Sequence, residues 1–206
     1  MLGVSKCLNP SPHTVVYDVS QCYHHRRVKY LIQDSGLQPG DLTHTFASAV
    51  RDEFNSDVLG WLESSDLSEG RGLYIYASPT PENPAGTGTG KTYCLHALAV
   101  KALNQCRSVR FFTSSELINW YRKCAQDNDP SENEELASYD FLCWDDIGKE
   151  CTASEWTEGK IFNLINLRYR YRRPIAFSSN CKSEGLAQRL RPRHGSACVS
   201  RMREMC

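Results

Sequence analysis

A glycine-rich run, Gly86-Thr87-Gly88-Thr89-Gly90-Lys91-Thr92, constrains the fold of this chain more than any other feature. It stands between a short β-type run, Leu73–Tyr76, and a helical pattern from about Lys91 to Gln105. Glycines let backbone N–H groups point inward around a phosphate chain, and the N-terminus of the following helix favours anions. In such a loop the lysine reaches the β- and γ-phosphates, and the Thr92 hydroxyl binds Mg²⁺. The run therefore predicts a phosphate-binding loop.

Two features depart from the usual G-x-x-x-x-G-K-T pattern. Ala85 stands where the first glycine is expected, with Gly86 directly after it. A proline-rich insertion from Ser78 to Pro84 also lengthens the connection from the strand. The alternative interpretation is a Gly/Thr-rich linker that happens to precede a lysine. The strand before the run and the helix after it favour the phosphate loop.

Strand and helix patterns alternate along the rest of the chain. Further β-type runs are expected at 109–112, 141–144 and 174–177, and helices at 28–33, 41–65, 113–125, 152–171 and 184–190, with a short one from Ser131. Thr113 with Glu116 predicts a capping box. Repeated β-α-β units predict an α/β fold in three layers, a parallel sheet flanked by helices. We assign residues 41–206 to this domain and residues 1–40 to a short N-terminal appendage.

Polar residues end two of the predicted strands. Asp145 and Asp146 follow the apolar run Phe141–Trp144, and Asn180 follows the last strand. The carboxyl ends of parallel strands meet at the edge where ligands bind in open α/β sheets. Asp145 would hold hydrated Mg²⁺, Asp146 would orient or deprotonate the attacking water, and Asn180 would hold that water. Taken singly, each is also an ordinary solvated turn residue.

Composition narrows the class of protein. Lys+Arg 24 and Asp+Glu 24 give a formal net charge of +0, so any contact with nucleic acid requires a local patch. No apolar run approaches the roughly 18 residues of a membrane span, and Met1–Pro12 carries no apolar signal region. We expect a cytoplasmic protein with no membrane contact. Its 10 cysteines include no C-x-x-C pair and are expected to be reduced.

These motifs resemble those of bacterial and phage replicative helicase loaders of the DnaC/DnaI type, which are AAA+ ATPases. The resemblance runs from about Tyr30 to Cys206, through the glycine-rich run, Asp145–Glu150, Ile165–Tyr169 and Ser178-Ser179-Asn180. It implies an AAA+ P-loop NTPase without a full lid domain and Mg²⁺-dependent ATP hydrolysis. It also implies a hexameric helicase and single-stranded DNA as partners, and a homo-oligomer when ATP is bound. By this resemblance Gly86–Thr92 and Asp145 bind ATP, and Asp146 and Asn180 are catalytic.

The resemblance also assigns an arginine finger. Val199-Ser200-Arg201-Met202 is similar to the segment that carries it, which makes Arg201 the best candidate, with Arg203 and Arg193 as rivals. Such an arginine acts on the ATP of a neighbouring subunit. Members of the family usually continue into a fifth strand beyond the position of Cys206, so we expect a truncated or divergent member.

Two weaker patterns remain open. The run Arg168-Tyr169-Arg170-Tyr171-Arg172-Arg173 would suit single-stranded DNA, but cations also collect at the ends of helices for local reasons. Cys7, Cys22, His24 and His25 are a degenerate zinc pattern, for which solvated loop residues are the simpler interpretation. Cys94 and His96 are expected to be packing residues.

Two alternative functions stay open beside helicase loading. A transposition-helper ATPase of the same superfamily would carry nearly the same motifs but bind duplex DNA and a transposase. A non-catalytic interaction module would have lost ATPase activity through Ala85, the insertion and the shortened C-terminus.

Overall fold

Four parallel strands form the sheet at the centre of the molecule. The computed structural model describes residues 23–67, 70–77, 80–81, 83–84, 86–127, 131–148, 154–190 and 195–206. Across the sheet the strands follow the order β1 (Leu73–Tyr76), β4 (Ile175–Ser179), β3 (Phe141–Asp145) and β2 (Val109–Thr113). Leu73 pairs with Ala176, Leu142 with Ile175, and Val109 with Phe141. The predicted α/β fold is confirmed, and all four strands fall where the sequence places them.

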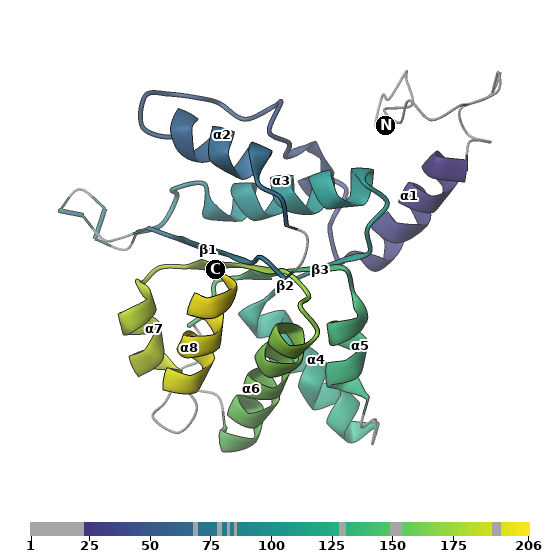
Figure 1. Cartoon of the computed structure of the whole chain (residues 1–206), viewed down its shortest axis with the longest axis vertical. Coiled ribbons are helices and arrows are strands. Elements are labelled where there is room, and N and C mark those ends of the chain that lie inside the picture. Colours follow the sequence, from purple (N-terminus) through teal and green to yellow (C-terminus); the bar gives the residue numbers. More distant parts are fainter. Residues whose placement is uncertain are drawn as a thin grey trace.

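Helices cover both faces of the sheet (Figure 1). On one face lie α1 (Tyr23–Asp34), α2 (Ser56–Ser64) and α3 (Lys91–Asn104), with a 3-10 turn, η2 (Asp41–Thr43), between the first two. The other face carries α4 (Ser114–Gln126), α5 (Glu132–Ser138), α6 (Glu155–Arg170), α7 (Ser183–Arg189) and α8 (Gly195–Met205). In the described part of the chain, no helix has the length and apolar character needed to cross a membrane.

The core has two halves, one on each face of the sheet. Leu95 and Leu98 of α3 pack on one face, and Leu164 of α6 packs with Trp144 and Phe177 on the other. Every residue of β3 is buried, as expected for an apolar strand with helices on both sides. Among the described residues the cysteines form no disulfide.

Local hydrogen bonds set where several helices begin. The predicted capping box is confirmed, because Thr113 Oγ1 accepts from the backbone N–H of Glu116 and the Glu116 carboxylate accepts from that of Thr113. The helix predicted over 41–65 is wrong in extent. Asp52 Oδ1 accepts the N–H groups of Phe54 and Asn55, forming a turn that delays the helix to Ser56.

Helix α8 is not among the helices that the sequence predicts. It begins at Gly195 and packs beside α7 and α6. Helix α6 begins after Ser154, whose Oγ accepts from the N–H of Thr157; the predicted start of this helix at residue 152 lies outside the described residues. The α6 and α8 faces meet through apolar side chains such as Val199 and Met202, so tertiary packing supports α8 where the local sequence signal is weak.

The segment from Tyr23 to Gly40 packs against the sheet domain. Leu37 is buried in the core on the α3 face, and Phe111 of β2 donates its N–H to the carbonyl of Ser35, 2.7 Å away. Arg110 Nη1 donates to the carbonyl of Asp34 at 2.9 Å, and Tyr139 donates its hydroxyl to the Asp34 carboxylate at 2.9 Å. The described part of the predicted appendage therefore lies against the free edge of β2.

Candidate nucleotide-binding site

The predicted phosphate loop follows β1 and opens α3. Its three glycines, Gly86, Gly88 and Gly90, have φ values of 60°, 69° and 78°, all in the left-handed region. An L-residue pays roughly 1–2 kcal/mol there, and glycine does not. Gly90 is the N-cap of α3 and makes no side-chain capping hydrogen bond, and the N-terminus of such a helix favours an anion.

Lys91 is held against its own loop. Its Nζ donates to the carbonyl of Gly86 at 2.7 Å and to Thr89 Oγ1 at 3.0 Å, and the residue is 8% exposed. The ammonium group therefore lies over the loop from which a lysine of this motif binds phosphate oxygens.

Asn83 stabilises the N-terminal end of the loop through hydrogen bonds. Its Nδ2 donates to the carbonyl of Thr87 at 2.7 Å, its Oδ1 accepts from the N–H of Thr87, and its carbonyl accepts from the N–H of Gly86. Sequence reasoning missed this role, although Asn-Pro is a turn signal. The end of the proline-rich insertion is thus part of the loop's support.

Thr92 and Asp145 meet across the gap between α3 and β3. The Thr92 hydroxyl lies 2.9 Å from Asp145 Oδ2 and 3.2 Å from Oδ1, and Asp145 is 4% exposed. A hydroxyl and a carboxylate beside a phosphate loop are the hard oxygen donors that Mg²⁺ prefers. The pair therefore fits the predicted metal position, and Thr92 and Asp145 would hold the ion.

Ser178, which the sequence placed only at a strand end, joins the two acidic residues. Its Oγ donates to Asp145 Oδ1 through a short hydrogen bond and accepts from the N–H of Asp146 at 2.9 Å. Ser114, at the start of α4, donates to the carbonyl of Asp146 at 3.0 Å and accepts from Trp144 Nε1. Serines from β4 and α4 thus fix the backbone turn after β3.

Asp146 and Asn180 both lie just beyond the carboxyl ends of their strands. Asp146 has a φ of 60°, a left-handed conformation that turns the chain sharply after β3. Asn180 directly follows β4, the strand that pairs with β3, and is partly buried. The structure brings both residues to the edge of the sheet that carries the phosphate loop.

Arg201 lies apart from this edge, on α8. Its Nε donates to Asn166 Oδ1 on α6 at 2.7 Å, and its guanidinium stacks 5.0 Å from the centre of the Phe162 ring. Arg203 forms an ion pair with Glu184 on α7. The other rival, Arg193, lies outside the described residues. Within one chain, therefore, Arg201 binds α6, and its role as a finger for a neighbouring subunit stays a prediction.

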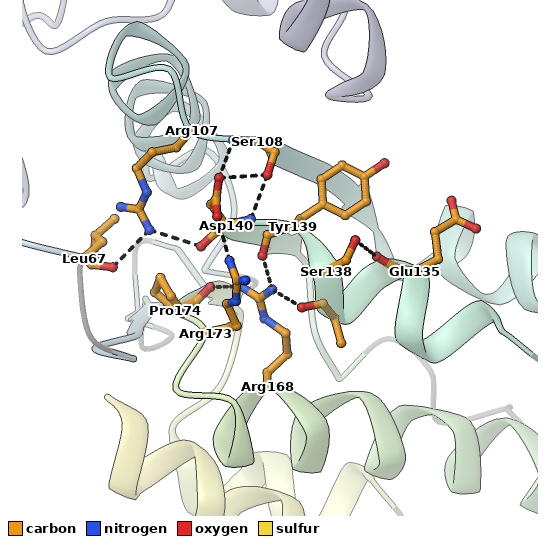
Figure 2. Close-up of polar contacts among 11 residues, drawn as sticks. Leu67, Arg107, Ser108, Glu135, Ser138, Tyr139, Asp140, Arg168, Arg173 and Pro174 are labelled. Atoms are coloured by element: carbon orange, nitrogen blue, oxygen red, sulfur yellow. Dashed lines mark hydrogen bonds and ion pairs between the residues drawn. The ribbon is translucent and has the colours of Figure 1, made fainter.

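Arg168 belongs to the protein interior (Figure 2). It is fully buried, and its guanidinium donates to the carbonyls of Ala137, Tyr139 and Pro174. Burial and the neighbouring Arg173 lower the pKa of Arg168 to about 9, so the group stays protonated at neutral pH. Arg168 is the first residue of the arginine-tyrosine run that could suit single-stranded DNA, and its side chain is instead held in the protein interior. Arg170 and Arg172 are exposed.

The predicted zinc pattern is only partly visible. Cys7 and Cys22 lie outside the described residues, while His24 Nδ1 lies 3.1 Å from the thiol of Cys106. The Nδ1 atom of His25 is buried and has no hydrogen-bond partner. His96, expected as a packing residue, is buried against Phe111 and also pairs with His44: their Nδ1 atoms are 2.8 Å apart.

Comparisons with solved structures identify the fold. The crystal structure of DnaI aligns with a TM-score of 0.66 and 20% identity, over 84% of this chain and 93% of that one. That of the DnaC helicase loader aligns with a TM-score of 0.64 and 21% identity, over 82% and 96%. AMPPCP-bound DnaA from Aquifex aeolicus gives 0.65 and 20%, over 80% of this chain and 49% of that one. The chain thus spans about half the length of this DnaA structure.

A protein-family model also matches this sequence. The model described as IstB-like ATP binding protein matches residues 84–190, just over half of the 206 residues. The matched range contains the phosphate loop, the β3 aspartates and Asn180. The chain has a four-stranded parallel sheet with the predicted phosphate loop at the start of α3, shares the fold of DnaI and the DnaC helicase loader, and belongs to the IstB-like ATP-binding family.

Proposed function

We propose that this protein is a cytoplasmic, Mg²⁺-dependent ATPase that loads a replicative hexameric helicase onto single-stranded DNA. The contact between Thr92 and Asp145 beside the phosphate loop carries the ATPase part of the proposal, because it joins both halves of a nucleotide site. The helicase and DNA partners rest on the shared fold with DnaI and the DnaC helicase loader.

The residues of the site suit a nucleotide switch. The α3 N-terminus and Lys91 would bind the phosphate chain of ATP, and Asp146 and Asn180 would orient the attacking water. Mg²⁺, when held by Thr92 and Asp145, would neutralise negative charge on the phosphates. Binding of ATP would favour an assembled state that grips DNA, and hydrolysis would release it.

The first experiment is an equilibrium titration of fluorescent ATP with Mg²⁺ against wild type, Lys91→Ala and Lys123→Ala. Lys123 is an exposed lysine of α4 and serves as the matched control. Wild type and Lys123→Ala are expected to bind alike, whereas Lys91→Ala binds at least about tenfold more weakly because a charged phosphate contact is lost. A folded wild type that binds no ATP would exclude the switch.

A second candidate is a transposition-helper ATPase, favoured by the family match, which is to IstB-like proteins. Labelled single-stranded and duplex oligonucleotides distinguish the two when added to the protein with Mg²⁺-ATP. Preference for the single strand, lost in Lys91→Ala, supports the loader. Preference for the duplex supports the transposition helper.

The third function from the sequence, a non-catalytic interaction module, makes a different prediction. Partner binding by such a module would be unaffected by Lys91→Ala. Loss of helicase binding in this variant, with unchanged folding by circular dichroism, would exclude it.

A further inference from the structure

Three metal-ligating side chains meet on the α3 face, outside the nucleotide site. Asp41 of η2, His44 just after it, and His96 of α3 each offer one ligand atom, and these atoms all lie within 4.8 Å of one another. The two histidine Nδ1 atoms are 2.8 Å apart, and His96 Nδ1 lies 3.6 Å from Asp41 Oδ1. The cluster joins two segments that are about fifty residues apart in the chain.

The surroundings hold these side chains in place. The two imidazole rings are nearly parallel, with an interplanar angle of 6°, and the ring of Phe111 lies against His96. The Asp41 carboxylate accepts the N–H of Gln38 through Oδ2 at 2.8 Å, which orients Oδ1. Such a hydrogen bond to the second oxygen is the outer contact that typically fixes a ligating carboxylate.

Loop contacts place His44 over α3. Tyr93, in the first turn of α3, donates its hydroxyl to the carbonyl of Thr45 at 2.8 Å, and its ring lies 4.8 Å from that of His44. The His96 side chain is only 8% exposed and that of Asp41 25%, so the cluster is shielded but reachable from solvent. The positions of the three ligand atoms are therefore set by neighbouring contacts.

These three ligand atoms suit Zn²⁺. Two imidazole nitrogens and a carboxylate oxygen, with water in the fourth position, are common ligands of Zn²⁺. Zinc bonds of about 2.0–2.2 Å place tetrahedral ligand atoms roughly 3.3–3.6 Å apart. The 3.6 Å separation between His96 Nδ1 and Asp41 Oδ1 lies at the upper end of this range, and the 2.8 Å between the two Nδ1 atoms lies below it. Small side-chain rotations would admit the ion.

We propose that Asp41 Oδ1, His44 Nδ1 and His96 Nδ1 bind one Zn²⁺ ion. The ion would connect the segment around η2 to α3. Its ligand on α3, His96, stands four residues after Thr92 and thus about one helical turn from the predicted phosphate loop. This site is separate from the Mg²⁺ position at Thr92 and Asp145, and it does not depend on the proposed function.

The test is a zinc titration of the full, EDTA-treated chain by calorimetry without nucleotide, followed by X-ray absorption at the zinc edge. We expect one ion per chain and a first shell of nitrogen and oxygen at about 2.0–2.2 Å. His44→Phe keeps an aromatic ring beside Tyr93, and Asp41→Asn keeps the shape of the side chain. Each is expected to weaken zinc binding at least about tenfold.

The control is a double variant, His24→Gln with His25→Gln, which alters the other histidine pair and is expected to bind zinc as wild type does. Three results would overturn the proposal: no zinc binding by wild type, sulfur ligands at about 2.3 Å, or full affinity in Asp41→Asn and His44→Phe. Weaker binding in the control alone would place the ion at the N-terminal histidines instead. In each of these cases His44 and His96 form only a hydrogen-bonded pair.

Discussion

Ser178 shows how much one small side chain contributes to the candidate site. Its hydroxyl donates to the buried Asp145 carboxylate and accepts from the backbone of Asp146. Thr92 supplies a second hydrogen bond to the same carboxylate. Because a buried carboxylate needs such donors, Ser178 both stabilises Asp145 and sets the direction of its oxygens.

Replacing Ser178 by alanine tests this positioning role. We expect the free energy of unfolding to fall by about 1–3 kcal/mol, since buried polar groups lose a partner. The Mg²⁺ concentration needed for ATP binding should rise, while binding without Mg²⁺ changes little. Urea unfolding and nucleotide titrations measure the two effects. Ser179→Ala, which removes hydrogen bonds to the Ile147 carbonyl and to Cys181 but leaves the contacts of Ser178 with Asp145 and Asp146 in place, is the control; an equal Mg²⁺ effect there would contradict the role.

Arg168 gives a second prediction for a single side chain. Arg168→Met removes the guanidinium that donates to three buried carbonyls and should lower the free energy of unfolding by about 3 kcal/mol or more. Arg170→Ala, on the exposed side of the same helix end, should change it by less than about 0.5 kcal/mol. Denaturant unfolding of both variants compares them. Similar stabilities would mean that the buried contacts contribute little.

The carboxylate of Asp140 connects the residues that precede β2, β3 and β4 (Figure 2). Asp140, just before β3, accepts from the backbone and hydroxyl of Ser108, just before β2, at 3.0 Å each. Arg173, just before β4, donates to it at 2.6 Å. Burial alone would raise the pKa of Asp140, but the Ser108 hydrogen bonds and Arg173 outweigh it and lower the pKa below its ordinary value.

This arrangement predicts a pH dependence of stability. Because the pKa of Asp140 is lowered by folding, its ionised form stabilises the protein above the unfolded value near 3.9, and the effect is lost as the pH falls through the folded value. Asp140→Asn should therefore cost about 1 kcal/mol at pH 7. The difference from wild type should shrink below about pH 4. A constant difference between pH 7 and pH 3 in urea unfolding would contradict this account.

At the scale of the whole molecule, the proposed function requires subunits to act together. An arginine finger from a neighbouring subunit would act on bound ATP, and Arg201 is the residue that the family resemblance assigns to this role. In the single chain this side chain fastens α8 to α6 through Asn166 and Phe162. Acting on another subunit's ATP would require Arg201 to leave Asn166 or to use its remaining N–H groups.

Arg201→Ala and Asn166→Ala distinguish the two roles. Both remove the same hydrogen bond, but only the first removes the guanidinium. If Arg201 is the finger, Arg201→Ala lowers the ATPase rate of the assembled protein by roughly a thousandfold with ATP binding retained, and Asn166→Ala has a small effect. The rates are measured at concentrations where the protein is assembled. Equal losses in the two variants would show that Arg201 acts only through packing.

Local sequence determined the strands, the glycine-rich turn before α3 and the capping box of α4, because these features depend on neighbouring residues. It also indicated that Thr92 and Asp145 share a site, since the carboxyl ends of parallel strands meet at one edge. Tertiary structure alone decided the burial of Arg168, the bridge made by Ser178 and the pairing of His44 with His96. The contacts of Arg168 with Ala137, of Ser178 with Asp145 and of His44 with His96 join segments about thirty residues apart or more, and no periodicity or motif within one segment encodes the partner.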